Sequence, residues 1–207
     1  MGRFVVFEGI DKSGKTTQIE MIYKYLKDKY GNVILIKEPG TTELGEELRQ
    51  LLLNKSIKIS PISELFLYLA ARAQLIEEYI KNYKNEDIII LSDRYYYSTI
   101  AYQGYGRGLD VDMLLYLNKI VVNDYEPDYI FFFDIDNNTF IKRKGDKIDR
   151  IEKERIEFFE KVKEGYYFIF KSKKNVFYID ATKSKDEIFN EILKIFESKI
   201  LGREERK

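Results

Sequence analysis

A glycine-rich run near the N-terminus has the residue types and the spacing that bind phosphate. It reads Gly9-Ile10-Asp11-Lys12-Ser13-Gly14-Lys15-Thr16 and fits the pattern G-x-x-x-x-G-K-[ST] at every position. Glycines let the backbone approach phosphate oxygens closely, so that consecutive N–H groups and the N-terminus of a following helix face the anion. In this pattern the lysine reaches the β- and γ-phosphates of a nucleotide, and the hydroxyl holds Mg²⁺. The run predicts a nucleotide site but does not choose a reaction.

The composition excludes several other kinds of site. The 207 residues include no cysteine and no histidine, which excludes disulfides, thiolate nucleophiles, Cys/His zinc sites and triads with an imidazole base. Thirty-five Lys and Arg balance 35 Asp and Glu, so no net positive field attracts a nucleic-acid polymer or an anionic membrane. Neither a signal-peptide pattern nor a stretch of about 18 apolar residues occurs. We therefore expect a cytoplasmic protein.

The elements that must position the phosphate run are buried strands alternating with helices. Strands are expected where short runs are dense in Val, Ile and Phe without alternation, at residues 3–8, 33–37, 87–92, 128–134 and 175–180. Apolar stripes at helical spacing lie between them, and two of these are Ile19, Ile22, Tyr23 and Leu26, and Leu65, Leu69, Ala73, Ile76 and Ile80. The phosphate run follows the first strand and opens the first helix. This order predicts a three-layer α/β fold, with a five-stranded parallel sheet covered by helices on both faces.

Local signals mark helix starts and chain boundaries. Ser60 before Pro61, and Ser184 three residues before Glu187, predict two helix N-caps. We expect a single domain over residues 1–207. The polar, basic stretch 142–147 predicts a short mobile lid over about residues 142–150, and residues 202–207 are expected to fray.

A GTPase is disfavoured by the missing base-recognition element. That class needs N-K-x-D, but the Asn-Lys pairs at 54–55 and 118–119 have no Asp at the required place. The D-x-x-G run at 28–31 ends the first helix instead of following a strand. The residues by themselves thus indicate a phosphotransferase of the phosphate-loop class.

Further motifs give the chain a family resemblance. The second strand ends in Glu38-Pro39-Gly40-Thr41-Thr42, and a helix carrying Arg49 follows. After the third strand comes the run DRYYYSTIAYQG at residues 93–104, and later DRIE at 149–152. With the phosphate run, this series resembles the thymidylate kinases in order and spacing, from about residue 3 to about residue 182. The resemblance implies the fold of P-loop nucleoside monophosphate kinases, transfer of the γ-phosphoryl group of ATP to dTMP in dTTP synthesis, Mg²⁺ as cofactor, and a homodimer.

That reaction suits a chain without histidine. The attacking group is the phosphate of dTMP, which is already an anion near neutral pH because the second pKa of a phosphate monoester is about 6. No protein base is required, and catalysis depends on positioning and on neutralising charge between two phosphate groups.

The resemblance also implies roles for individual residues. Arg94 and Arg49 resemble the clamps of the acceptor phosphate, where a guanidinium fork suits bidentate binding. Asp93, at the carboxyl edge of the sheet, would hold Mg²⁺ together with Thr16. The catalytic set implied is Lys15, Arg94, Asp11, Lys12 and Arg143, and the ATP site comprises Gly9, Ile10, Asp11, Lys12, Ser13, Gly14, Lys15, Thr16, Thr17 and Arg143.

The nucleoside of dTMP would be bound by a second group of side chains. Tyr68 and Arg72 are four apart on one helix, share a face, and match the residues that stack on thymine and bond its O4. Thr99, Tyr102 and Gln103 match residues around thymine and deoxyribose, with Tyr102 closing the place of a ribose 2′-hydroxyl. Asp11 matches the residue at the 3′-hydroxyl, and Glu38-Pro39, expected to be cis, turns its loop toward the acceptor. Arg143 matches a residue stacked on adenine, and Arg150 begins the second helix of the lid.

Blander interpretations stay open for some of these residues. Asp93-Arg94 could be a strand-end ion pair, Tyr68 a core aromatic, and Lys144 and Lys147 part of a solvated face. The apolar stripes of the first and third helices would serve a dimer, but core burial explains them equally. Two other functions also remain: a kinase of this fold acting on another nucleoside monophosphate or a deoxynucleoside, and a nucleotide-binding regulator without catalysis. Retention of Lys15 together with both acceptor clamps argues against the regulator.

Overall fold

The protein is built on a five-stranded parallel sheet with the strand order β2-β3-β1-β4-β5. The computed structural model describes residues 2–83, 86–144 and 150–202. The strands are β1 (Arg3–Gly9), β2 (Val33–Lys37), β3 (Ile89–Asp93), β4 (Tyr129–Asp134) and β5 (Val176–Asp180). In β1, β3 and β4 nearly every side chain is buried, as expected for apolar runs that do not alternate. The parallel sheet predicted from these runs is confirmed.

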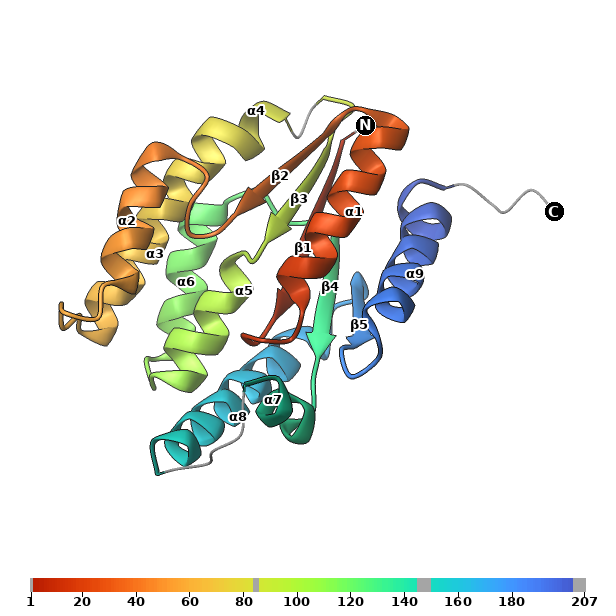
Figure 1. Ribbon diagram of the computed structural model, residues 1–207. Helices are drawn as coiled ribbons and strands as arrows, with labels where there is room; N and C mark the ends of the chain where they lie inside the picture. Colours follow the sequence, from red (N-terminus) through yellow and green to blue (C-terminus); the bar gives the residue numbers. More distant parts are fainter. Residues whose placement is uncertain (1, 84–85, 145–149, 203–207) are drawn as a thin grey trace.

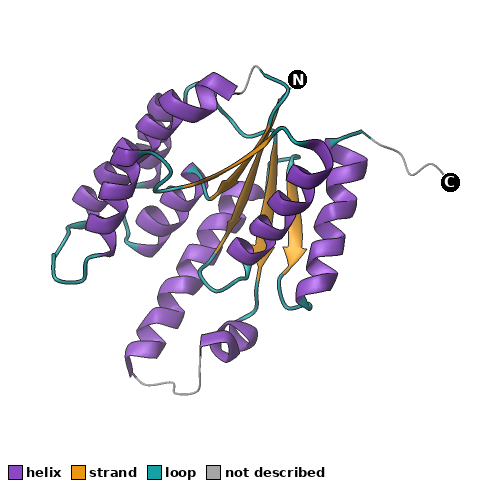
Figure 2. Cartoon of the chain, turned by 45° about the horizontal axis from the view of Figure 1, so that its top comes forward, coloured by secondary structure: helices purple, strands orange, loops and turns teal. Residues whose placement is uncertain are grey.

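Helices cover both faces of the sheet, as Figures 1 and 2 show. The α-helices are α1 (Lys15–Tyr30), α2 (Glu43–Leu53), α3 (Pro61–Leu75), α4 (Lys81–Tyr83), α5 (Tyr96–Thr99), α6 (Val111–Val122), α7 (Asn137–Lys144), α8 (Arg150–Phe170) and α9 (Lys185–Ile195). π-Helical turns extend three of them, namely η1 (Ile76–Ile80), η2 (Ile100–Gly106) and η3 (Phe196–Ile200). α1 and α9 pack side by side on one face, while α5 packs on β1 and against α3, α6 and α8 on the other.

Two of the predicted helix starts are confirmed in detail. The Ser63 N–H donates to the Ser60 hydroxyl at 3.2 Å, with Pro61 at the start of α3. At α9 the Ser184 hydroxyl accepts from the Glu187 N–H, and the Glu187 carboxylate accepts from the Ser184 N–H. These three contacts satisfy N–H groups that have no partner inside the helix.

The predicted apolar stripe of α3 is wrong at one position. Ala73 is exposed, and Arg72 is buried with Leu65 and Leu69. The reason is helical geometry: seven residues after Leu65 is nearly two full turns, whereas eight residues lie about 80° off that direction. A charged side chain therefore occupies the position where the apolar pattern led us to expect alanine.

The predicted lid and tail lie largely outside the described residues. α7 extends to Lys144, so residues 142–144 are helical, and α8 begins at Arg150 as expected. The lid residues 145–149, among them Lys147, and the tail residues 203–207 lie outside the part of the chain that the structure describes. Among the described helices, none is long and apolar enough to cross a membrane.

Candidate active site

The phosphate run forms a tight loop between β1 and α1 at the carboxyl edge of the sheet. Its backbone enters the left-handed region at Lys12 (φ 66°) and at Gly14 (φ 90°), which is the N-cap of α1. A Cβ at Gly9 (φ 148°) would lie 2.8 Å from the carbonyl oxygen of Phe133 on β4. Glycine is therefore required at position 9 by packing as well as by conformation.

A cavity of about 630 Å³ opens in front of this loop. Apart from Gly9, which lies behind it at the end of β1, the structure brings all residues predicted for ATP to this cavity: Ile10, Asp11, Lys12, Ser13, Gly14, Lys15, Thr16, Thr17 and Arg143. Arg143 comes from α7 and spans the loop. It donates to the carbonyl oxygens of Ser13 (3.0 Å) and of Ala181 (2.7 Å), the residue after β5.

Lys15 and Asp93 form a buried ion pair beside the loop. The Lys15 Nζ lies 2.7 Å from Asp93 Oδ1, and the Thr16 hydroxyl donates to Asp93 Oδ2 at 2.8 Å. Burial opposes the charged form of Asp93, but the charges of Lys15 and Arg94 and the bonds from Lys15 and Thr16 outweigh it and lower the pKa of the carboxyl. Burial, followed by the charge of Arg94, lowers the pKa of Lys15, against the opposing effect of Asp93.

The same residues fit a magnesium ion. Thr16 and Asp93 offer hard oxygen atoms that already lie within hydrogen-bond distance of each other, next to the phosphate loop. Among the described residues, no group of three or more acidic, His or Cys side chains is arranged to hold a metal ion. This donor set suits Mg²⁺, which is usually held by one or two protein oxygens together with water and substrate phosphates.

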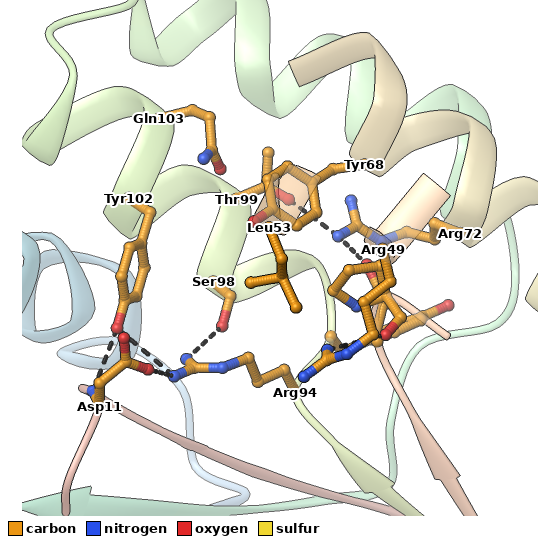
Figure 3. A pocket seen from close by; sticks show the side chains of 13 residues that line it. Asp11, Arg49, Leu53, Tyr68, Arg72, Arg94, Ser98, Thr99, Tyr102 and Gln103 are labelled. Atoms are coloured by element: carbon orange, nitrogen blue, oxygen red, sulfur yellow. Dashed lines mark hydrogen bonds and ion pairs between the residues drawn. The ribbon is translucent and has the colours of Figure 1, made fainter. Parts of the chain in front are cut away.

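A second cavity, of about 270 Å³, adjoins the first. Every residue predicted for dTMP lines it, although these residues come from β1–α1, β2–α2, α3, β3–α5 and η2 (Figure 3). They are Asp11, Glu38, Pro39, Arg49, Tyr68, Arg72, Arg94, Thr99, Tyr102 and Gln103, joined by Leu53, Tyr95 and Ser98. Asp11 lines both cavities, so the two sites meet at this residue.

Two arginines mark the end of the second cavity nearest the phosphate loop. Arg94 Nη2 lies 2.6 Å from Asp11 Oδ1, and its guanidinium lies 5.2 Å from the centre of the Tyr102 ring. Arg94 itself adopts φ 75°, an uncommon backbone conformation for a residue with a side chain. Arg49 reaches in from α2 and donates to the Pro39 carbonyl at 3.1 Å. Arg94 and Arg49 are two of the three arginines that line this small cavity (Figure 3).

The other end of this cavity is built on Arg72, whose side chain is 1% exposed. The guanidinium donates to Glu38 and Asn118, and to the Thr99 hydroxyl at 2.8 Å. Burial raises the pKa of Glu38, although the charge of Arg72 opposes this. Among the described residues, neither Glu38 Oε2 nor Arg72 Nε has a hydrogen-bond partner. Both of these unbonded atoms are buried in the wall of the cavity.

Tyr68 lies on the same side of α3 as Arg72 and is half-buried at the cavity (Figure 3). Burial raises the pKa of its hydroxyl. The Glu38–Pro39 peptide bond is cis, which confirms the expectation for this loop. Gln103, at the rim, donates to Glu64 at 2.8 Å.

The sequence reasoning missed several polar residues behind the cavity. Asn118 on α6 orients Arg72, and Glu8, Ser98 and Tyr166 surround Arg94 from β1, α5 and α8. Ser98 stands four residues after Arg94, within the DRYYYSTIAYQG run, and Glu8 is an acidic residue inside an apolar strand, so both residues could have been singled out from the sequence. No sequence signal marked Asn118 or Tyr166, because their partners Arg72 and Arg94 are distant in sequence.

Comparisons with known proteins agree with this geometry. A sequence model described as thymidylate kinase matches residues 7–192. A thymidylate kinase of Thermosipho africanus is 45% identical over 195 residues, covering 94% of this chain and 97% of that protein. A thymidylate kinase of Finegoldia magna is 42% identical, covering 93% and 96%. The crystal structure of thymidylate kinase from Ehrlichia chaffeensis superposes with a TM-score of 0.80 at 33% identity, covering 94% of this chain and 98% of that one. This chain belongs to the thymidylate kinase family.

Proposed function

We propose that this protein transfers the γ-phosphoryl group of ATP to dTMP, giving dTDP and ADP for dTTP synthesis. One observation carries the proposal: a phosphate-loop cavity and a second cavity lined by three arginines meet at Asp11. The relatives from Thermosipho africanus and Finegoldia magna bear the name of this activity. A cavity for a triphosphate and a cavity for a smaller anion, in contact, are what transfer between two phosphate groups requires.

On the ATP side, the loop N–H groups and Lys15 would bind the β- and γ-phosphates. Lys15 is buried beside Asp93, so its ammonium is held in place before the nucleotide arrives. Thr16 and Asp93 would hold Mg²⁺, which neutralises phosphate charge when bound. Lys12 and Arg143 line the same cavity and would add positive charge near the transferred group, while Thr17 extends the site along α1.

On the acceptor side, Arg94 and Arg49 would clamp the phosphate of dTMP. The acceptor oxygen is already charged near neutral pH, so the arginines have to orient it and offset its repulsion from the γ-phosphate. The Asp11 carboxylate, which is paired with Arg94, would accept a hydrogen bond from the 3′-hydroxyl of the sugar. No general base is needed among the protein side chains.

At the far end, the thymine ring would stack on Tyr68 and receive a hydrogen bond from Arg72. Thr99 and Gln103 would lie beside the base, with Glu38 and Pro39 forming the wall behind it. Tyr102 would fill the space that a ribose 2′-hydroxyl needs, which favours deoxyribonucleotides. This arrangement distinguishes dTMP from other monophosphates of the same charge.

An ATP-consumption assay with Mg²⁺ tests the function directly. We expect dTMP to be the preferred acceptor over dUMP, dCMP, UMP, AMP and thymidine. A preference for another monophosphate or for thymidine would instead support a kinase of the same fold with a different substrate. Nucleotide binding without consumption of ATP would support the non-catalytic regulator.

We also propose that the protein forms a homodimer through α3 and α6. These helices contact each other and expose large apolar side chains, namely Ile62, Phe66, Leu115, Tyr116 and Ile120. In α1, Ile19, Ile22 and Leu26 are buried in the core, which fits the alternative that core burial explains this stripe. Phe66→Lys should convert a dimer to a monomer in light scattering, whereas Phe168→Lys, an exposed site on α8, should not. The single-domain organisation and the cytoplasmic location stay predictions.

A further inference from the structure

Glu8 is a buried carboxylate to which the mechanism above gives no role. It lies near the end of β1, directly before the phosphate loop, and is fully buried. Its Oε1 accepts from the Tyr95 N–H at 2.8 Å, and its Oε2 accepts from the hydroxyls of Ser98 (2.7 Å) and Tyr166 (2.9 Å). A carboxylate without solvent is strongly unfavourable unless it is bonded and paired. The three groups that donate to Glu8 are neutral, so the positive charge that compensates the carboxylate must lie behind them.

That charge is Arg94. Its Nη1 lies 3.0 Å from the Ser98 hydroxyl, 3.2 Å from the Tyr166 hydroxyl and 2.8 Å from the Gly9 carbonyl. Both hydroxyls therefore stand between the carboxylate and the guanidinium. Burial raises the pKa of Glu8, while the positive charge of Arg94 and the bonds from Ser98, Tyr95 and Tyr166 oppose that shift.

The protons in this cluster determine what the cluster can do. Each hydroxyl has a single proton, whereas Arg94 has only donors. The two hydroxyls also lie 2.8 Å from each other. If both donate to Glu8, their oxygens are left as acceptors that share the two N–H groups of Nη1 with the Gly9 carbonyl. If the group at position 8 were neutral and itself a donor, at least one hydroxyl would be driven to turn its proton toward Arg94, and a hydrogen bond would become a donor–donor clash.

We propose that Glu8 is a positioning residue for the acceptor-phosphate clamp, acting through Ser98 and Tyr166 to hold Arg94. With Nη1 anchored in this way, Nη2 faces Asp11 and the Tyr102 hydroxyl, which line the second cavity. Tyr166 lies on α8, which begins at Arg150, at the end of the predicted lid segment 142–150, so the clamp is also tied to that helix. The inference rests on the proposed function, because it assumes that Arg94 binds the phosphate of dTMP.

Three substitutions each change one polar group of the cluster formed by Glu8, Ser98 and Tyr166. Glu8→Gln keeps the shape and replaces an acceptor by a donor, and Ser98→Ala removes one hydroxyl. Tyr166→Phe removes the other but keeps the ring, which packs on Phe132 at 5.2 Å between ring centres. Tyr97→Phe is the matched control, because it also removes a hydroxyl from a buried ring of the same region, one bonded to Glu126 at 3.2 Å and outside both cavities.

The readout is the affinity for dTMP compared with thymidine, measured by calorimetry. Only the clamp acts on the phosphate, so Glu8→Gln and Tyr166→Phe should weaken dTMP binding by about 10-fold or more, the size expected for a lost hydrogen bond to a charged group. In the same two variants the affinity for thymidine should stay within about 2-fold of that of the unmodified protein. Tyr97→Phe should change neither the affinity for dTMP nor that for thymidine, because it leaves the clamp intact. Equal weakening of dTMP and thymidine, or no weakening of either, would overturn the proposal.

Arg94→Ala separates this inference from the proposed function. If Arg94→Ala binds dTMP normally, the assignment of the clamp itself is wrong. If Arg94→Ala loses dTMP affinity while Glu8→Gln and Tyr166→Phe do not, only the positioning role is wrong. Adding Glu8→Gln to Arg94→Ala should give no further loss for dTMP, since a residue acting through Arg94 has nothing left to position. If Glu8→Gln fails to fold, Tyr166→Phe carries the test alone.

Discussion

The buried pair of Arg72 and Glu38 allows recognition of thymine to be separated from stability. The two side chains are 1% and 2% exposed, and the Arg72 guanidinium also donates to Asn118 and Thr99. Arg72→Met removes the charge but keeps much of the side-chain volume. Because Glu38 would then be a buried carboxylate with no compensating charge, the free energy of unfolding should fall by about 3–5 kcal/mol.

A second substitution should restore stability but not binding. In Arg72→Met/Glu38→Gln the uncompensated charge is gone, so we expect most of the lost unfolding free energy to return. The donor to the thymine carbonyl is still missing, however, so affinity for dTMP should be low in both variants while affinity for ATP is unchanged.

The pH dependence follows from the same pair. Burial raises the pKa of Glu38, and the charge of Arg72 opposes that rise. Without Arg72 the pKa of folded Glu38 should rise further above its unfolded value, so the folded state binds more protons. Stability then falls as pH rises from the unfolded pKa through the folded one. The deficit of Arg72→Met relative to the unmodified protein should therefore be smaller at pH 5 than at pH 7.

Urea unfolding at both pH values, with calorimetry of dTMP and ATP binding, measures all of these quantities. The reasoning is refuted if Arg72→Met unfolds like the unmodified protein, or if the double variant is no more stable than the single one. A loss of ATP affinity with normal dTMP affinity would show that Arg72 has been assigned to the wrong nucleotide.

Three further predictions concern single residues of the two cavities. Lys15→Ala should lower turnover by at least about 100-fold, roughly 2.7 kcal/mol, with the fold preserved by circular dichroism, since its charge acts mainly in the transition state; near-normal turnover would contradict this. Asp93→Asn should raise the Mg²⁺ concentration needed for half-maximal ATP consumption, and an unchanged Mg²⁺ titration would remove Asp93 from the metal site. Tyr68→Phe should bind dTMP normally, because it keeps the ring that would stack on thymine, whereas Tyr68→Leu should lose about 1–3 kcal/mol of stacking; calorimetry that ranks the two variants equally would place the ring outside the base site.

Much of this protein is determined locally along the chain. The phosphate loop is contiguous, and its glycines, lysine and threonine suffice to specify a turn between strand and helix. The strands follow from continuous apolar runs, and the starts of α3 and α9 follow from Ser60 and Ser184, because capping involves only residues within one turn. The family resemblance also predicted ten of the residues that line the second cavity, but not Leu53, Tyr95 or Ser98.

Only the tertiary structure decided how polar residues pair inside the core. Periodicity placed Ala73 in the apolar stripe of α3, whereas the folded chain buries Arg72, because Glu38 and Asn118 from other elements satisfy its guanidinium. Likewise, Glu8 and Tyr166 meet across 158 residues of sequence. A polar group is buried at little cost only where it has a hydrogen-bond or charge partner. In these two cases the partner comes from an element that is distant in sequence, so a local sequence pattern does not reveal it.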